Sequence, residues 1–436
     1  MSLTTLTPAT DAAVTIAFHP LDDADRQHLS AHYWRWCELL DCDSSARISQ
    51  HPDYVFAETH TQSGRSGCRS DSLSDSDGTA IRPNGIVLCE ATRNDQLVAL
   101  GVLAPKSMSL RQAGGFGPVR DIHGYRLSGN RLLGNPSDEL QSQMLAACAT
   151  FAREQHATYL LIEDLERDAP LFAAAESLTY DGFRLFSPTG TQARLKIEFP
   201  LKPDDYWSKF SSKTRNTFRR KQKRIGPTRV LRITEPGQVA EFLEAAHVIS
   251  QRTWQSDQFG LRIRNNETEL RLLTFLTTQR ALRSYLLFVD DKPVAFLVGT
   301  QFKGLFSYEE VGYDRDFAGR SPGQVLLLHV LDDLLKHDPP RVFDFGGGDA
   351  EYKRLFATKA STSGNVWLVP PGLRPQTCLT YLRGCRFVDR TARELVRKLG
   401  LTTLLRQLMR GKRNFATRSS GTEATGRDDS ADGGAS

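Results

Sequence analysis

The side chains best suited to proton transfer in this sequence lie close together in its second half. Two adjacent carboxylates, Glu309 and Glu310, lie in a β-rich run, and Tyr352 and Lys353 follow a turn of three glycines that leads into Asp349. A carboxylate can accept a proton, and a phenol or an ammonium group can return one. We therefore predict that these five residues are the catalytic residues.

The elements that carry them have the pattern of strand, loop, helix, strand and helix. Apolar residues recur at helical spacing from Val325 to Leu335, whereas 342–345 is a short β-rich run closed by the three glycines. Pro322 suits the first position of a helix, and Asp349 is an N-cap type. We expect the two helices to begin there.

The same periodicities predict how the catalytic candidates point. Successive side chains of a strand alternate between its faces, so one of Glu309 and Glu310 should face the substrate, and the sequence does not show which. Asp349 and Lys353 lie four residues apart on one helical face, with Tyr352 beside them. A surface ion pair would also explain that spacing, but a turn of three glycines favours a site where a ligand approaches the backbone closely.

Both predicted helix starts are candidate anion sites, because helix N-termini present unpaired amide donors and the positive end of the dipole. An ordinary well-capped helix is the alternative. A separate cationic helix is predicted from Ser211 to Arg224, and only Phe218 and Ile225 at its end are available for burial. Its lack of acidic residues favours phosphate binding over a solvated face. We expect the substrate or its phosphates to contact Lys213, Arg215, Asn216, Arg219, Arg220 and Asp344.

Together these segments resemble the GNAT-like acyltransferases grouped with cellulose and exopolysaccharide biosynthesis, which share their fold with Fem-type peptidyltransferases. The resemblance spans most of the chain. Its carriers are Tyr313-Asp314, Ser321-Pro322-Gly323, Asp344, Gly348-Asp349, Tyr352-Lys353 and the basic segment from Ser212 to Arg220. It implies an α/β fold of tandem GNAT-like (acyl-CoA N-acyltransferase) domains with mixed central sheets.

The resemblance also assigns roles. In GNAT enzymes the acyl-CoA pyrophosphate lies on backbone amides where the helix after the fourth strand begins. Here Val325 stands where a small residue is usual, and Pro322 removes one amide donor. The implied cofactor-binding residues are Arg320, Ser321, Gly323, Gln324, Gly347 and Gly348. Tyr352 takes the position of the acid, with Tyr313 as a weaker candidate, and the acyl group passes directly to the acceptor.

Three functions follow from these residues. The first is an acyltransferase, acetyl-CoA being the expected donor, that acts on an amine or hydroxyl of a saccharide or of a cell-envelope or exopolysaccharide precursor. The second is a Fem-type transferase that uses aminoacyl-tRNA, and the third is a non-catalytic binding protein on a GNAT scaffold. We expect no metal, and no DNA partner.

Composition limits the protein class. Of the 436 residues, 39% are hydrophobic and 25% are charged, the net charge is +5, and no stretch approaches the ~20 apolar residues that span a bilayer. Seven scattered cysteines without CxxC pairs indicate neither a disulfide framework nor a zinc site. We expect a cytoplasmic protein. The basic stretch 391–413 suits either peripheral contact with an anionic membrane, at the inner face, or docking on the catalytic domain, which is the commoner arrangement.

The chain divides into five predicted segments. Residues 1–12 are a disordered N-terminus, 13–192 a first GNAT-like domain with a mobile insertion at 61–79, and 193–371 the catalytic GNAT-like domain. Basic helices occupy 372–411, and the composition of 412–436 predicts a disordered tail. We expect the first domain to be a structural wall of the cleft between the two.

Overall fold

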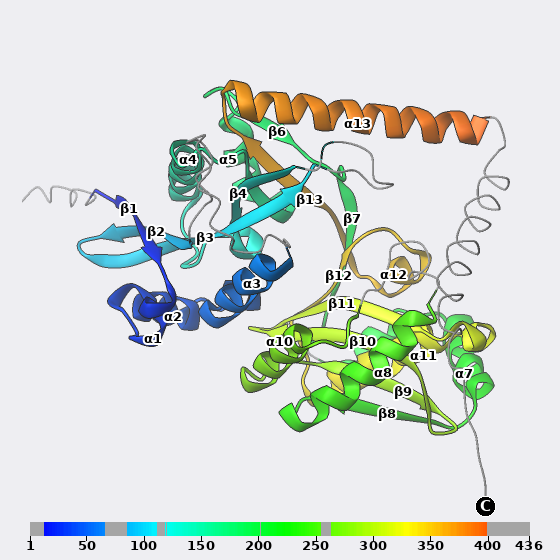
Figure 1. Cartoon of the computed structure of the whole chain (residues 1–436). Coiled ribbons are helices and arrows are strands. Elements are labelled where there is room, and N and C mark those ends of the chain that lie inside the picture. Colours follow the sequence, from blue (N-terminus) through cyan, green and yellow to red (C-terminus); the bar gives the residue numbers. More distant parts are fainter. Residues whose placement is uncertain are drawn as a thin grey trace, which may run out of the picture. The chain divides into compact units, whose positions relative to one another are not determined.

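The computed structural model describes residues 13–65, 85–110, 118, 120–200, 202–253 and 263–398 (Figure 1). The predicted disordered ends 1–12 and 412–436 and the remainder of the insertion, 66–79, lie outside these residues. The insertion was predicted to begin at Thr61, and this start is wrong. Helix α3 (Pro52–Arg65) continues through it.

The first half is a mixed sheet with one crossover helix. Four strands pair antiparallel in chain order, and after the helix a fifth strand lies parallel to the fourth. These elements are β1 (Thr15–Leu21), β2 (Ile86–Arg93), β3 (Gln96–Ser109), β4 (Asp121–Leu127), α4 (Asp138–Glu154) and β5 (Leu160–Glu166). Strands β2 and β3 form a hairpin that turns at Asn94 and Asp95, both with positive φ.

The second half repeats this order. Again four antiparallel strands are followed by a helix and a strand parallel to the fourth. The elements are β8 (Thr228–Ile233), β9 (Ser284–Val289), β10 (Lys292–Phe302), β11 (Leu305–Tyr313), α11 (Pro322–His337) and β12 (Val342–Gly347). The prediction of two copies of one α/β arrangement with mixed sheets is therefore confirmed.

Helices cover both faces of each half. In the first half α4 and α5 (Pro170–Ser177) pack on one face, and α2 (Ala31–Cys42) and α3 supply the core of the other. In the second half the corresponding pairs are α7 (Ser212–Ile225) with α11, and α8 (Val239–Gln251) with α10 (Glu267–Thr278). Shorter helices are α1 (Asp23–Gln27), α6 (Pro203–Ser208) and the 3-10 turns η1 (Ile48–Gln50), η2 (Ser128–Asn130), η3 (Pro236–Gln238) and η4 (Arg315–Arg320).

The two halves share one continuous sheet (Figure 1). After α12 (Glu351–Phe356) the chain returns as β13 (Lys359–Val369), which pairs with β5 of the first half and with β7 (Gln192–Glu198), while β7 pairs with β12. The chain up to Gln376 accordingly forms one compact unit. The predicted boundary between residues 192 and 193 therefore does not separate two compact domains.

The 3-10 turn η1 separates α2 from α3, and the segment before β7 contains α5 and the short strand β6 (Arg184–Phe186). The C-terminal helix α13 (Leu373–Lys398) lies within the predicted basic helices 372–411, and the rest of that prediction lies outside the described residues. Among the described helices, none is long and apolar enough to cross a membrane.

The return strand generates a prediction about stability. Leu368 on β13 is fully buried in the first core, so Leu368→Ala should lower the free energy of unfolding by about 2–5 kcal/mol through lost burial and a cavity. Leu373→Ala is the matched control, because Leu373 is 88% exposed. Urea unfolding measures both variants, and equal losses would contradict the packing of β13 described above.

Candidate functional site

A cavity opens where β11 and β12 separate. The two strands pair at only three positions, from Leu305 with Val342 to Ser307 with Asp344, and then diverge. A cavity of about 510 Å³ lies beyond the last pair. The second half lines it with Ser307, Tyr308, Glu309, Glu310, Val311, Asp344, Phe345, Gly346, Gly347, Tyr352 and Lys353. The divergence therefore brings four of the five predicted catalytic residues to one cavity, and Asp349 does not line it.

Glu309 is the extra residue of a β-bulge. Val298 of β10 pairs with Glu310, and the next residue, Gly299, pairs with Tyr308, so Glu309 has no opposite partner. A bulge interrupts the alternation of side chains along a strand. The prediction that only one of Glu309 and Glu310 faces the site is therefore wrong, because both line the cavity.

The Glu309 side chain is exposed to the cavity. Its Oε1 accepts a hydrogen bond from Thr300 Oγ1 at 2.8 Å. Burial raises the pKa of Glu309 to about 7, the Thr300 hydrogen bond opposes the rise, and the nearby Glu310 adds to it. A carboxylate with this pKa can exchange a proton near neutral pH.

Tyr352 of α12 lies beside Tyr308 of β11, and both line the cavity. Burial raises the pKa of both phenols, and the hydrogen bond between the two hydroxyls raises the pKa of Tyr308 further and opposes the rise at Tyr352. Tyr352 is therefore a protonated phenol at the cavity, and its role as the acid stays a prediction.

Lys353 and Asp349 do not form the expected pair. The Lys353 ammonium donates to the backbone oxygens of Phe345 at 2.8 Å and Gly347 at 3.1 Å, and Asp349 is paired with Arg354. Helix α12 begins at Glu351 with Ala350 as its N-cap, so the predicted N-cap at Asp349 is also wrong. Lys353 holds the glycine turn in place.

The glycine turn has a conformational reason of its own. Gly346 and Gly348 have φ of 69° and 97°, which side chains with a Cβ rarely adopt. A close ligand is therefore not needed to explain these two glycines. Gly347 lines the cavity and Gly348 does not.

Asp344 is a partner of Arg194 and is not a free ligand. Its Oδ2 accepts from Arg194 Nε of β7 at 2.8 Å, and its Oδ1 accepts from the Gly346 backbone N–H at 2.9 Å. Both ionic side chains are buried. Asp344 therefore joins β7, β12 and the glycine turn while it also lines the cavity, and its substrate-binding role stays a prediction.

The start of α11 lies next to the cationic helix α7. The α7 residue Lys221 contacts Gln324 Oε1 through its ammonium group. Ser321 has a left-handed backbone, Pro322 lacks an N–H, and the Gln324 N–H donates to Ser321 O. The helix start thus offers fewer open amides than an ordinary one, but Lys221 adds a cation that the sequence analysis did not select. None of Arg320, Ser321, Gly323 and Gln324 lines the cavity.

Helix α7 has the predicted form. Ser211 caps it by accepting from the Thr214 N–H, and Phe218 and Ile225 are its buried residues. Arg215 is half-buried and donates to Phe210 O, so it supports the helix start. The other predicted phosphate ligands are exposed and do not line the cavity: Lys213, Asn216, Arg219 and Arg220.

The comparison with family models agrees with this geometry. Residues 212–354 match the model of the acetyltransferase (GNAT) domain. This segment is a GNAT-type domain. It contains α7, the diverging strands, α11 and the start of α12, and therefore all the predicted cofactor-binding and catalytic residues. The search of curated proteins gives no match.

Solved structures resemble the chain beyond the GNAT domain. FemX superposes with a TM-score of 0.53 at 12% identity, over 77% of this chain and 96% of its own, a share that includes both halves. A tandem GNAT protein from the clavulanic acid biosynthesis pathway has a TM-score of 0.43 at 13% identity, covering 82% of this chain and 100% of its own. The C-terminal domain of a putative lysylphosphatidylglycerol synthetase from Agrobacterium fabrum has a TM-score of 0.42 at 14% identity, covering 65% of this chain and 84% of its own. The likeness to FemX shows that the fold is of the Fem type.

The first half supplies the opposite wall of the GNAT domain cavity. Its lining residues, none of which the sequence analysis selected, are Arg47, Ser49, Arg126, Gly129, Asn130, Glu163, Asp164 and Arg194. Arg126 is paired with Glu58 and Glu163 across the sheet. A local pattern could not have identified these residues, because they come from separate turns and strands. The internal repeat was the signal that could have found them, because several of these lining residues lie where β4 and β5 diverge, as the catalytic candidates do where β11 and β12 diverge.

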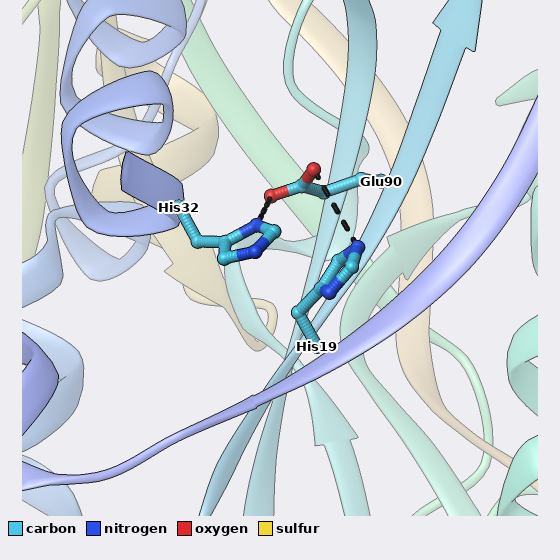
Figure 2. Close-up of side chains that lie close together, drawn as sticks. All are labelled: His19, His32 and Glu90. Carbon is cyan, nitrogen blue, oxygen red and sulfur yellow. Dashed lines mark hydrogen bonds and ion pairs between the residues drawn. The ribbon is translucent and has the colours of Figure 1, made fainter. Parts of the chain in front are cut away.

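A second polar cluster lies outside the GNAT domain. Figure 2 shows His19 of β1 and His32 of α2 pointing toward Glu90 of β2. His32 Nδ1 is 2.8 Å from Glu90 Oε1, and His19 Nε2 is 3.8 Å from Oε2. Two imidazoles and a carboxylate are a common ligand set for zinc, and the expectation of no metal did not consider them.

Arg35 already supplies positive charge to this cluster. Its Nη2 lies 2.8 Å from Glu90 Oε2 and 2.9 Å from His32 Nδ1, so a guanidinium nitrogen contacts two of the three ligand groups. A divalent cation there would meet this fixed charge. The arrangement therefore works as an ion-paired network that links β1, α2 and β2.

The geometry of Arg35 predicts how the cluster responds to zinc. Zn²⁺ should not raise the melting temperature of the wild-type protein, whereas Arg35→Met, which removes the competing charge, should create a Zn²⁺-dependent rise. The double variant Arg35→Met, Glu90→Gln should lose that rise. Differential scanning fluorimetry measures all three. A zinc-dependent rise in the wild-type protein that Glu90→Gln removes would show that Arg35 does not exclude the ion.

Proposed function

We propose that the protein is an acyl-CoA-dependent acyltransferase that transfers an acyl group directly to an amine or hydroxyl of a saccharide or cell-envelope precursor. The observation that carries the proposal is Glu309, a carboxylate on a bulge with a pKa of about 7, beside the divergence of β11 and β12. The GNAT domain assignment supports the reaction class. The acceptor class, with its link to exopolysaccharide, rests on the resemblance of the sequence motifs.

The cavity residues divide the proton transfers between them. Glu309 takes a proton from the acceptor nitrogen or oxygen, whose lone pair attacks the thioester carbonyl. The tetrahedral intermediate collapses, the carbon–sulfur bond breaks, and Tyr352 gives its proton to the departing thiolate. The products are the acylated acceptor and CoA. No enzyme nucleophile is required, so the acyl group moves within a ternary complex.

The phosphates of the donor belong at the junction of α7 and α11. Eight Lys and Arg residues and no acid lie between Lys209 and Arg224, and Lys221 contacts the first turn of α11 at Gln324. Cations beside a helix N-terminus attract phosphate. The thioester would then extend from this junction toward the divergence of β11 and β12.

An aminoacyl-tRNA donor is the second candidate. The fold shared with FemX and the exposed cations of α7 favour it, because a cationic helix can also bind RNA phosphates. The two donors differ in size and chemistry, so a direct binding comparison separates them. A cytoplasmic location, and peripheral membrane contact through residues 391–413, remain part of the proposal.

The pKa of Glu309 predicts the pH dependence of turnover. The carboxylate form is the base, so kcat/KM should rise with pH through about 7, and Glu309→Gln should lower it at least 100-fold, as for loss of a general base. An acylation assay that detects the thiol of the released CoA measures the pH dependence and the effect of the substitution. Glu310→Gln is the neighbouring control and should retain the pH dependence. A rise through pH 7 that survives Glu309→Gln would remove Glu309 as the base.

Donor binding is tested by thermal unfolding with acetyl-CoA, longer acyl-CoAs, free CoA and aminoacyl-tRNA. A ligand at 100 times its Kd should stabilise the protein by about 2.7 kcal/mol. Lys221→Gln should reduce the shift with acyl-CoA. Lys336→Gln, at the other end of α11 and 59% exposed, should leave it unchanged. A shift with aminoacyl-tRNA alone would favour the second candidate, and no shift with any donor would contradict both.

A further inference from the structure

The first half contains a second cavity at the place that corresponds to the first. The ladder between β4 and β5 ends at Leu127 with Ile162, as that between β11 and β12 ends at Ser307 with Asp344. Beyond it lies a cavity of about 590 Å³, next to the start of α4. Polar residues dominate its lining: Arg47, Asn130, Arg131, Asn135, Ser137, Asp138, Gln141, Glu166 and Asp168.

Arg47 connects the two cavities. It lines the cavity of the GNAT domain and also the second cavity, and Asn130 beside it does the same. Its backbone is held in place: the Arg47 N–H donates to Gln50 Oε1 at 3.0 Å, and the buried Gln50 is in turn bonded to Trp36 and to the Arg131 backbone. A ligand that spans both cavities would therefore pass the Arg47 side chain.

The Arg47 guanidinium lacks a protein partner within the described ranges. Its Nε is buried without a hydrogen bond, and among the described residues no carboxylate forms an ion pair with the group. The Nε of Arg126 also lacks a hydrogen bond, but the other arginines of the two cavities have carboxylate partners. Arg126 is paired with Glu58, Arg194 with Asp344, and Arg131 with Asp43 at 3.6 Å. Arg47 is thus set apart among these four cations.

The acids nearest to Arg47 are already engaged. Asp344 accepts from Arg194 and from the Gly346 N–H, and Glu166 accepts from Lys196 and Ser361. Burial lowers the pKa of Arg47, and the charge of Arg194 lowers it further. Arg47 is half-buried, and a buried donor such as its Nε is costly to leave without a partner. An anionic ligand is the partner that the surroundings lack.

We propose that Arg47 binds an oxyanion, a carboxylate or a phosphate, carried by the acceptor, and that the acceptor extends from the GNAT domain cavity into the second cavity. This inference rests on the proposed function and narrows its acceptor to an anionic molecule. The planar guanidinium can hold either oxyanion through two parallel hydrogen bonds, which an ammonium group cannot do. Asn130 and Asn135 add donors and acceptors for a polar, sugar-like body.

The role of Arg47 makes an unusual prediction for stability. Replacing a residue that only supports the fold lowers the melting temperature, whereas Arg47→Met removes a half-buried charge whose buried Nε has no hydrogen-bond partner. Its melting temperature without ligand should equal or exceed that of the wild-type protein. Arg194→Met, which leaves Asp344 without its partner, is the contrasting variant and should lower the melting temperature. A fall for Arg47→Met as large as that for Arg194→Met would show a structural role.

The ligand is tested by thermal unfolding of the full chain at constant ionic strength with inorganic phosphate and, separately, glucuronate. Either probe should raise the melting temperature of the wild-type protein, the rise should be lost in Arg47→Gln, and Arg47→Lys should recover part of it. Arg271→Gln, which removes a 76% exposed arginine from α10, should keep the full rise. A response to phosphate alone indicates a phosphorylated acceptor, and one to glucuronate alone indicates an acidic sugar. Equal rises in the wild-type protein and Arg47→Gln, or no rise with either probe, would overturn the proposal.

Donor binding separates this proposal from the proposed function. Arg47→Gln should keep the stabilisation by acetyl-CoA, because the donor phosphates are assigned to α7 and α11. Acetyl-CoA stabilisation without an Arg47-dependent probe response rejects the acceptor site alone. A probe response without acetyl-CoA stabilisation rejects the donor and keeps the anion site. Any phosphate bound near α7 would contribute equally to the wild-type protein and to Arg47→Gln, so their difference reports Arg47.

Discussion

Two buried charges meet in the middle of the continuous sheet, Arg194 on β7 and Asp344 on β12, with 2.8 Å between Nε and Oδ2. Removing two charges from water is costly, and the pair is tolerated because Asp344 also accepts from Gly346 and Arg194 also approaches Asp164 at 3.4 Å. This contact lies at the last pair of β11 and β12, where the cavity begins. Loss of either partner would leave a buried charge there, so the divergence of the strands, the glycine turn and the joining of the two halves all depend on it.

A second backbone irregularity, the β-bulge at Glu309, determines which side chains line the cavity at this divergence. The bulge at Glu309 turns this carboxylate into the cavity, and desolvation by the surrounding protein, more than the neighbouring Glu310, raises its pKa. Tyr352 and Tyr308 line the same cavity from α12 and β11. The proposed base and the proposed acid thus line one cavity, although neither belongs to a local sequence motif for catalysis.

The repeat of the fold explains why two cavities adjoin. Each half diverges after a short parallel ladder, and the shared sheet places the two divergences where Arg47 and Asn130 border both. The two halves differ in the residues that they supply. The second half carries Glu309 on its bulge and the cationic helix α7 beside α11. The first half supplies arginines, most of which are paired with carboxylates. A donor and an anionic acceptor could therefore approach the reaction centre from different sides.

Local sequence determined most of the elements and part of the site. The cap at Ser211 with Phe218 and Ile225 predicted α7, and the apolar spacing after Pro322 predicted α11, because capping and periodicity are properties of short segments. Residue types together with the resemblance to GNAT enzymes selected Glu309 and Tyr352. Tertiary structure decided the rest. The partner of Asp344 lies 150 residues away, the bulge depends on pairing with β10, and Arg47 reaches the cavity only because η1 packs against η2. Strand pairing and charge pairing between distant segments are settled by the packed fold, so a pattern within one segment carries no record of them.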